Sequence, residues 1–249
     1  MGGSVLAGSS FRAGSGRDDK ARAAKRLEET LRPDRRQPLR STTVSVRLVI
    51  FDCDGVLFHS ERANIAFYNA VLREIGEPPL AADAESAAHA LASSDLYQKY
   101  FGDRPAVLAR VREASRTLDY GPFYPLMKPH DRLREILARL RARYRTAMAT
   151  NRGKTAHGVL RHFSLDDLFD LAVGALDVER PKPHPDMLLR CLEHFDMVGD
   201  SAVYVGDQTI DAASARAAGL RFIGIGPAAR AARYGIERLD ELESLLASL

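Results

Sequence analysis

From residue 46 onward, two kinds of segment alternate along the chain. Short runs of apolar and β-branched residues, typical of buried strands, lie at 46–51, 144–150, 171–173, 202–205 and 221–225. Longer segments with helical periodicity predict helices at 130–143, 154–162, 186–194, 209–218 and 239–249. Strands that alternate with helices of this length predict an α/β fold, with a parallel sheet covered by helices on both faces.

Residues 61–127 interrupt this alternation, because they carry helical patterns and no strand pattern. Helices are predicted at 61–75, 81–100 and 104–118. The segment is too long for a loop, so we expect a helical cap domain of residues 61–127, inserted after the first strand and able to act as a lid. The α/β core is then expected to comprise residues 45–60 and 128–249.

The first 44 residues have a different composition. They are rich in Gly and Ser at the start and contain few apolar residues, so we expect a disordered tail. Residues 1–45 hold ten Lys and Arg against five acids, a net +5, which leaves 3 − 5 = −2 for the remainder. The basic character belongs to the tail, and no nucleic-acid partner is expected for the folded part.

Length and cysteine usage narrow the class of protein further. A chain of 249 residues can form one domain with a smaller insert. No stretch approaches the roughly 18 consecutive apolar residues of a membrane helix, so no membrane association is expected. Cys53 and Cys191 cannot form a disulfide framework, which favours a reducing, cytoplasmic location. Monomer and homodimer both remain open.

Two acids, Asp52 and Asp54, follow the first predicted strand, and Gly55 permits a sharp turn directly after them. With such a turn, both carboxylates can face one point beyond the strand end. One acid could then attack as a nucleophile while the other exchanges a proton. The Asp-x-Asp-Gly string is weakly specific by itself, because a solvated turn or a calcium loop would contain it too.

Three further groups of polar residues lie near predicted strand ends. Thr150 and Asn151 precede a helix and could bind an anion, although a helix cap is the commoner use of such residues. Lys182 lies in a proline-stiffened segment, where an ordinary surface lysine fits as well. Asp207 and Asp211 could likewise be a helix cap and a favourable first-turn charge.

Taken together, these residues are more informative than any one of them. They fall at the predicted ends of strands of one sheet, and the carboxyl ends of strands are where such sheets bind ligands. A phosphate dianion needs cations and hydrogen-bond donors, and hard oxygen ligands suit Mg²⁺. The set contains both kinds of group.

In this order, the motifs resemble those of the haloacid dehalogenase (HAD) superfamily of hydrolases over residues 46–225. Phe51–Leu57 resembles the first motif, Thr150 with Asn151 the second, Lys182 the third, and Asp207 with Asp211 the fourth. The helical insert resembles the cap of the phosphoglycolate phosphatase and β-phosphoglucomutase-like branch. The resemblance implies a HAD-like, Rossmann-like core with an inserted α-helical cap.

The same resemblance implies a Mg²⁺-dependent phosphatase that hydrolyses a small phosphorylated metabolite through an aspartyl phosphate. Asp52 would be the nucleophile, and Asp54 would protonate the leaving oxygen and then deprotonate water. The implied phosphate-binding residues are Thr150, Asn151 and Lys182. The implied Mg²⁺ ligands are Asp52, the Asp54 carbonyl, Asp207 and, as ligand or support, Asp211.

Two alternatives remain open beside a phosphatase. A phosphomutase would return the phosphoryl group to a second hydroxyl, but the mutases compared have a glutamate where this chain has Gly206. A non-catalytic phosphate-binding regulator would use the same pocket without turnover, which the intact acids and Lys182 disfavour. The substrate is expected to be phosphoglycolate-like or a sugar phosphate, with phosphoglycolate as the leading single expectation.

The predicted cap gives less guidance than the core. Its polar candidates for substrate contact are Arg62, Asn64, His89, Ser93, Ser94, Tyr97, Gln98 and Lys99. Leu91, Leu96, Tyr97 and Tyr100 fall at helical spacing, which favours packing over ligand contact. His59 is expected to be an exposed hinge residue, and Cys53 a structural one.

Overall fold

The computed structural model describes residues 45–81, 84–85, 87–88 and 91–249. The predicted tail of residues 1–44 and the cap candidate His89 lie outside this part of the chain. Six parallel strands form one sheet in the order β5-β4-β1-β6-β7-β8. Their bounds are β1 (Leu48–Phe51), β4 (Arg145–Ala149), β5 (Leu171–Val173), β6 (Ala202–Gly206), β7 (Arg221–Ile225) and β8 (Tyr234–Ile236). The predicted parallel α/β sheet is confirmed, with β8 as an additional edge strand.

Strand β1 lies between β4 and β6 and is buried along its whole length. Ile50 of β1 pairs with Ala147 of β4 and with Tyr204 of β6. Because the three strands run in the same direction, the residues that follow them meet at one edge of the sheet.

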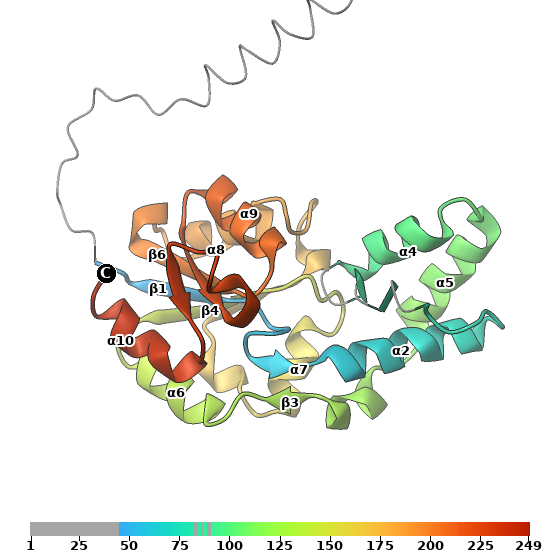
Figure 1. Ribbon diagram of the computed structural model, residues 1–249, viewed down its shortest axis with the longest axis horizontal. Coiled ribbons are helices and arrows are strands. Elements are labelled where there is room, and N and C mark those ends of the chain that lie inside the picture. Colours follow the sequence, from blue (N-terminus) through green and yellow to red (C-terminus); the bar gives the residue numbers. More distant parts are fainter. Residues whose placement is uncertain (1–44, 82–83, 86, 89–90) are drawn as a thin grey trace, which may run out of the picture. The chain divides into compact units, whose positions relative to one another are not determined.

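Helices cover both faces of the sheet (Figure 1). Leu48 and Ile50 pack in one apolar cluster with residues of α8 (Asp186–His194), on the face that α9 (Thr209–Ala218) also covers. Val49 and Phe51 point the other way and pack in the cluster that includes α6, α7 and α10. Their bounds are Leu133–Arg141, Ala156–His162 and Leu242–Leu246. This alternation follows from the period of two of a strand buried on both faces.

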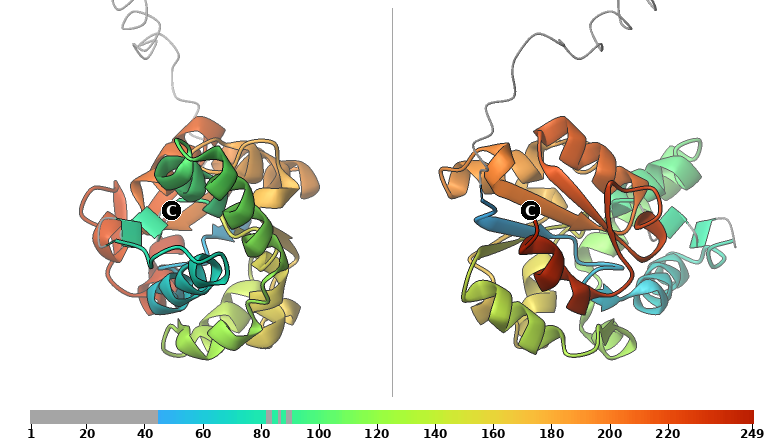
Figure 2. Two further views of the ribbon diagram at one scale, coloured as in Figure 1. Left: turned by 90° about the vertical axis from the view of Figure 1, so that its right-hand side faces the viewer. Right: turned by 60° about the vertical axis from the view of Figure 1, so that its left-hand side comes forward.

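Helices are inserted between the two strands of a small antiparallel ribbon, in which β2 (Phe58–His59) pairs with β3 (Lys128–Pro129). Within the described part of this insert they include α2 (Glu61–Glu74), α4 (Ser93–Phe101) and α5 (Pro105–Thr117), followed by the 3₁₀ helix η1 (Gly121–Leu126). Helix α2 packs against α5 and η1, and α4 packs against α5. Figure 1 shows α2, α4 and α5 to one side of the sheet and its covering helices, and in the left view of Figure 2 the same helices lie in front of the sheet. We call α2, α4 and α5 the inserted helices.

Two predicted helices have different bounds in the structure. The pattern at 81–100 predicts one helix, but the chain bends at Leu91 and Ala92 is extended, so α4 begins only at Ser93. The Ser-Ser-Asp sequence there is typical of a helix start. The C-terminal segment forms η6 (Leu239–Glu241) and then α10, rather than one helix over 239–249. Shorter 3₁₀ helices are η2 (Asp166–Leu168), η3 (Ala175–Asp177), η4 (Gly199–Ser201) and η5 (Gly226–Ala228).

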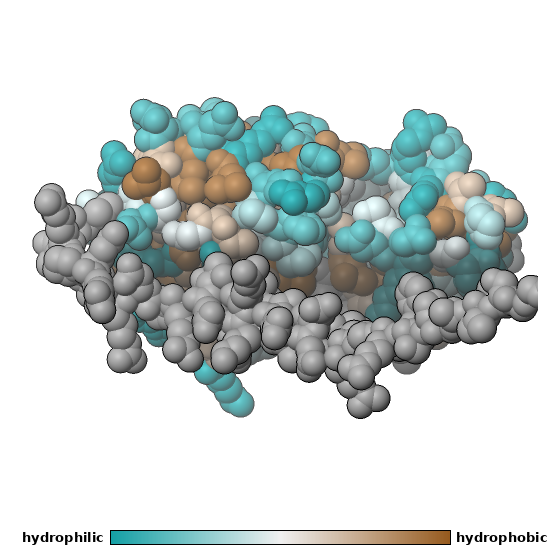
Figure 3. Space-filling view, turned by 90° about the horizontal axis from the view of Figure 1, so that it is seen from above, coloured by the Kyte–Doolittle hydropathy of each residue, from teal (hydrophilic) through white to brown (hydrophobic). Residues whose placement is uncertain are grey.

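On the face that Figure 3 shows, hydrophilic residues alternate with apolar areas. Large hydrophobic side chains that are exposed include Leu176, Leu189 and Val198. Among the described residues, no helix has both the length and the apolar character needed to cross a membrane.

Candidate active site

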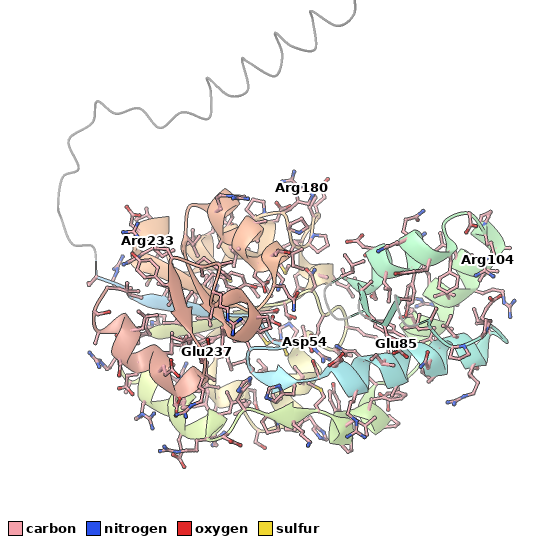
Figure 4. The ribbon with its side chains drawn as sticks, viewed as in Figure 1. Asp54, Glu85, Arg104, Arg180, Arg233 and Glu237 are labelled. Carbon is pink, nitrogen blue, oxygen red and sulfur yellow. The ribbon has the colours of Figure 1, made fainter. Side chains whose placement is uncertain are left out.

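Residues from three neighbouring strand ends form the candidate site. Asp52 directly follows β1, Thr150 follows β4, and Asp207 follows β6. All three side chains are buried. Figure 4 shows Asp54 near the start of α2, at the junction between the sheet and the inserted helices. The structure therefore brings the predicted site residues of three motifs to one edge of the sheet, as the strand pattern predicts.

Lys182 lies at the centre of the buried charges. Its Nζ atom lies 2.8 Å from Asp52 Oδ1 and 2.8 Å from Asp211 Oδ1. The hydroxyl of Tyr204, on β6, lies 2.9 Å from the same Nζ and 3.1 Å from Asp211 Oδ1. Lys182 is only 2% exposed, so its interpretation as an ordinary surface lysine is wrong.

Asn151 holds the backbone of Lys182 in place. Its Oδ1 accepts a hydrogen bond from the Lys182 N–H at 3.0 Å, and its Nδ2 donates to the Lys182 carbonyl at 3.2 Å. The next peptide bond, to Pro183, is cis. Asn151, from the second motif, thus positions Lys182, from the third, because its side-chain amide bonds both backbone groups of the lysine.

Asp211 has a structural role as well as an electrostatic one. Its Oδ2 accepts hydrogen bonds from the N–H groups of Asp207 at 3.2 Å and Gln208 at 3.0 Å. Asp211 therefore satisfies backbone donors at the start of α9, the first-turn role that its position suggests. The same carboxylate, through Oδ1, also contacts Lys182.

Two glycines leave room for these carboxylates. A Cβ atom on Gly55 would overlap the carboxylate of Asp207, and one on Gly206 would overlap Asp211. Gly55 also has a φ of +81°, which a side chain disfavours. The glycines at these positions are therefore required by the packing of the acids.

Asp54 has a different partner from Asp52, which sequence reasoning missed. Arg152 donates from Nε to Asp54 Oδ2 at 2.9 Å and from Nη2 to Asp54 Oδ1 at 2.6 Å. Ser60 also donates to Asp54 Oδ1, and Asn64 contacts the same oxygen at 3.4 Å. The only sequence signal for this pair is an arginine that follows Thr150 and Asn151 at a strand end.

Burial and neighbouring charges shift the pKa values of Asp52 and Lys182, the two residues in contact at the centre of the site. Burial raises the pKa of Asp52, and the nearby acids add to this effect while Lys182 opposes it. Burial alone would lower the pKa of Lys182, but Asp211 and Asp52 outweigh it and raise that pKa. Lys182 is accordingly a buried ammonium group.

The donor set fits a divalent cation. Asp52, Asp207 and Asp211 are buried, and each offers a carboxylate oxygen, with these oxygens all within 4.8 Å of one another. Three carboxylates and the Lys182 ammonium sum to −3 + 1 = −2 when all are ionised. A dipositive ion with a preference for oxygen ligands would balance this charge.

A pocket of about 320 Å³ opens above these residues. Its lining includes Asp52, Thr150 and Lys182 from the edge of the sheet, and Tyr68 and Arg112 from the inserted helices. Of the polar candidates named from the sequence, those that line it are Asn64, Ser93, Ser94 and Tyr97. Arg62, Gln98 and Lys99 do not belong to its lining.

Comparison with known proteins identifies the family. The family model for haloacid dehalogenase-like hydrolases matches residues 49–225. The chain is 30% identical over 199 residues to "Putative pyrophosphatase PpaX" from Caldanaerobacter subterraneus, covering 73% of this chain and 82% of the relative. It is 29% identical over 198 residues to a phosphoglycolate phosphatase from Cereibacter sphaeroides, covering 70% and 82% respectively.

A solved structure of a HAD-superfamily hydrolase of subfamily IA from Geobacter sulfurreducens is similar in fold. It superposes with a TM-score of 0.69 at 34% identity, covering 81% of this chain and all of the other. The chain therefore belongs to the haloacid dehalogenase-like hydrolases. The resemblance read from the four motifs is confirmed.

Proposed function

We propose that this hydrolase is a Mg²⁺-dependent phosphatase that acts on a small phosphorylated metabolite through an aspartyl phosphate on Asp52. The observation that carries the proposal is the contact of Asp52 with Lys182, which both line a pocket, next to the buried acids Asp207 and Asp211. A carboxylate nucleophile, a buried cation and an oxygen-rich cation site are the groups that phosphoryl transfer needs.

Asp52, Asp207 and the Asp54 backbone carbonyl would hold the Mg²⁺ ion, with Asp211 as a ligand or as support for the others. When bound, the ion supplies positive charge that reduces the repulsion between an anionic nucleophile and an anionic phosphate. The three buried acids, Asp52, Asp207 and Asp211, whose carboxylate oxygens all lie within 4.8 Å of one another, support this assignment.

The steps of the reaction fall to residues of the chain itself. An oxygen of Asp52 forms a bond to phosphorus while the bond from phosphorus to the leaving oxygen breaks. Asp54 gives its proton to that leaving oxygen. Water then attacks phosphorus, Asp54 takes a proton from the water, and the bond to Asp52 breaks to release phosphate.

Thr150, Asn151 and Lys182 are proposed to bind the phosphate oxygens during these steps. Thr150 and Lys182 are buried and line the pocket, and Asn151 fixes the Lys182 backbone. Such donors are effective because they are held in place before the substrate arrives.

The inserted helices are proposed to act as a cap that closes over this site, with domain boundaries at residues 61 and 127. Their contribution to the wall of the pocket supports this role. A volume of about 320 Å³ lies at the low end for small-molecule sites. We therefore propose a small phosphorylated metabolite as substrate, with phosphoglycolate first among those to test.

A mutase is less well supported than a phosphatase. A Cβ atom at position 206 would overlap Asp211, so the glutamate of the mutases cannot replace Gly206 without displacing that acid. A cytoplasmic location and a monomeric or homodimeric state stay predictions.

Phosphate release from phosphoglycolate and about a hundred other phosphorylated metabolites, with Mg²⁺ and after EDTA treatment, tests the function. We expect turnover of at least one substrate that EDTA abolishes and Mg²⁺ restores. Isomerisation of glucose 1-phosphate would instead indicate a mutase. An activity that resists EDTA would remove the metal assignment, and tight binding without turnover would support the regulator.

A further inference from the structure

We propose that Arg152 is a positioning residue that holds the carboxylate of Asp54 in the orientation needed for proton transfer, and that Asn64 of α2 and Tyr120, which precedes η1, keep Arg152 in place. This inference rests on the proposed function, because it gives Asp54 the acid–base role. It adds a residue that acts on the leaving group without touching the phosphate.

The contact between the two side chains is bidentate. Arg152 Nε lies 2.9 Å from Asp54 Oδ2, and Nη2 lies 2.6 Å from Asp54 Oδ1. A planar guanidinium that bonds both oxygens fixes the rotation of the carboxylate as well as its position. Arg152 is 7% exposed, so solvent does little to loosen this geometry.

The guanidinium is itself held by residues at both ends of the helical insert. Nη2 lies 3.2 Å from Asn64 Oδ1, in α2, and 3.5 Å from the hydroxyl of Tyr120, which precedes η1. The Tyr120 ring lies beneath the guanidinium, with the Arg152 carbon 5.1 Å from its centroid. The Tyr120 hydroxyl in turn lies 2.7 Å from Asn64 Oδ1.

The loop after β4 therefore contacts the insert where it leaves the core and where it returns. Lys154, two residues further on, bonds the carbonyls of Arg116 at 2.8 Å and Leu118 at 2.6 Å, at the end of α5. These hydrogen bonds join the end of α5 to the core. A movement of the insert away from the core would withdraw Asn64 and Tyr120 from Arg152, and the orientation of Asp54 would then be lost.

The nature of the leaving group provides the test. An alkoxide must be protonated as it leaves, whereas p-nitrophenolate leaves without a proton. For Arg152→Met, we expect kcat/KM for glycerol 2-phosphate to fall about 100-fold. For p-nitrophenyl phosphate, whose leaving group needs no proton, we expect kcat/KM to fall less than about fivefold. We compare kcat/KM because it reports the steps up to departure of the leaving group.

Matched variants separate positioning from a general loss of structure. Arg134→Met removes another bidentate arginine, which pairs with Asp167 at the surface. This variant should leave kcat/KM unchanged for both substrates. Arg152→Lys keeps a charge and should recover part of the activity on glycerol 2-phosphate. Tyr120→Phe should shift the ratio of the two kcat/KM values in the same direction as Arg152→Met, by a smaller factor.

Circular dichroism identifies variants that fail to fold, and the test then rests on Arg152→Lys and Tyr120→Phe. Equal losses on both substrates, no loss, or a gain on glycerol 2-phosphate would overturn the inference. Asp52→Asn tests the proposed function separately from the role of Arg152, because this variant should be inactive on both substrates. If Asp52→Asn stayed active, the proposed function would fail; if it were inactive and the ratio stayed constant in the Arg152 variants, this inference alone would fail.

Discussion

The Nζ atom of Lys182 lies 2.8 Å from Oδ1 of Asp52, and both side chains are buried. The two residues come from loops that are far apart in the sequence, and the backbone of Lys182 is fixed by Asn151. The position of the proposed nucleophile is therefore set by a cation that the fold itself carries. Substrate and metal ion would bind to a site whose charges are already arranged.

Replacing Lys182 should affect both stability and activity. Lys182→Met leaves the buried carboxylates of Asp52 and Asp211 without their ammonium partner, and breaking a buried ion pair costs about 3–5 kcal/mol. We expect a loss of this size in the free energy of unfolding, measured with urea, and a large fall in phosphatase activity. Lys128→Met, at an exposed position, is the control. Wild-type stability and activity in Lys182→Met would refute the central role of this lysine.

Gly55 and Gly76 form a matched pair for testing the contact with Asp207. Both have positive φ, +81° and +75°, but a Cβ on Gly55 would overlap the Asp207 carboxylate, whereas nothing lies within 4 Å of one on Gly76. Each alanine variant carries a left-handed strain of about 1–2 kcal/mol. We expect only Gly55→Ala also to raise the Mg²⁺ concentration needed for half-maximal activity. Equal Mg²⁺ dependence in the two variants would contradict the proposed place of Asp207.

His130 makes stability depend on pH. Burial and the adjacent His59, whose ring centroid lies 4.3 Å away, lower the pKa of His130. Between that lowered pKa and the ordinary value of about 6.5, the unfolded chain binds more protons than the folded one. Stability should therefore rise with pH through this window and be lost as the pH falls below about 6.5.

Thermal unfolding between about pH 5 and pH 7.5 measures this dependence. His130→Asn should flatten the curve in that window, whereas His157→Asn, at an exposed position, should leave it as in the wild type. A curve for His130→Asn with the wild-type slope would show that another group is responsible.

Much of the core could be predicted from the sequence, because the strand pattern has a simple physical cause. Strands buried on both faces are continuous apolar runs, and β1, β4, β6 and β7 lie close to their predicted positions. Since parallel strands end at one edge, the convergence of Asp52, Thr150 and Asp207 follows from the same pattern. Strand β8 is not among the predicted strands, because a three-residue edge strand with a central glycine carries little signal, and the two-residue strands β2 and β3 are not predicted either.

The contacts between side chains could not be predicted in the same way. Tyr204 occupies a strand position where an aromatic residue signals packing, and only the tertiary structure places its hydroxyl beside Lys182. Arg152 is one arginine among many in the sequence, and its pairing with Asp54 depends on how the loop after β4 meets α2 and η1. Local patterns do not contain such distances. The bend at Leu91 could not be predicted either, because apolar residues continue with helical spacing on both sides of it.

The covalent role of Asp52 is the central claim, and trapping of the intermediate tests it most directly. Rapid quenching of the enzyme during turnover, followed by borohydride reduction, converts an aspartyl phosphate to homoserine, which mass spectrometry of the peptides can locate. We predict substrate-dependent homoserine at position 52 and at no other aspartate, and none in Asp52→Asn. Trapping at another residue, or steady turnover of substrate by Asp52→Asn at the wild-type rate, would contradict the mechanism.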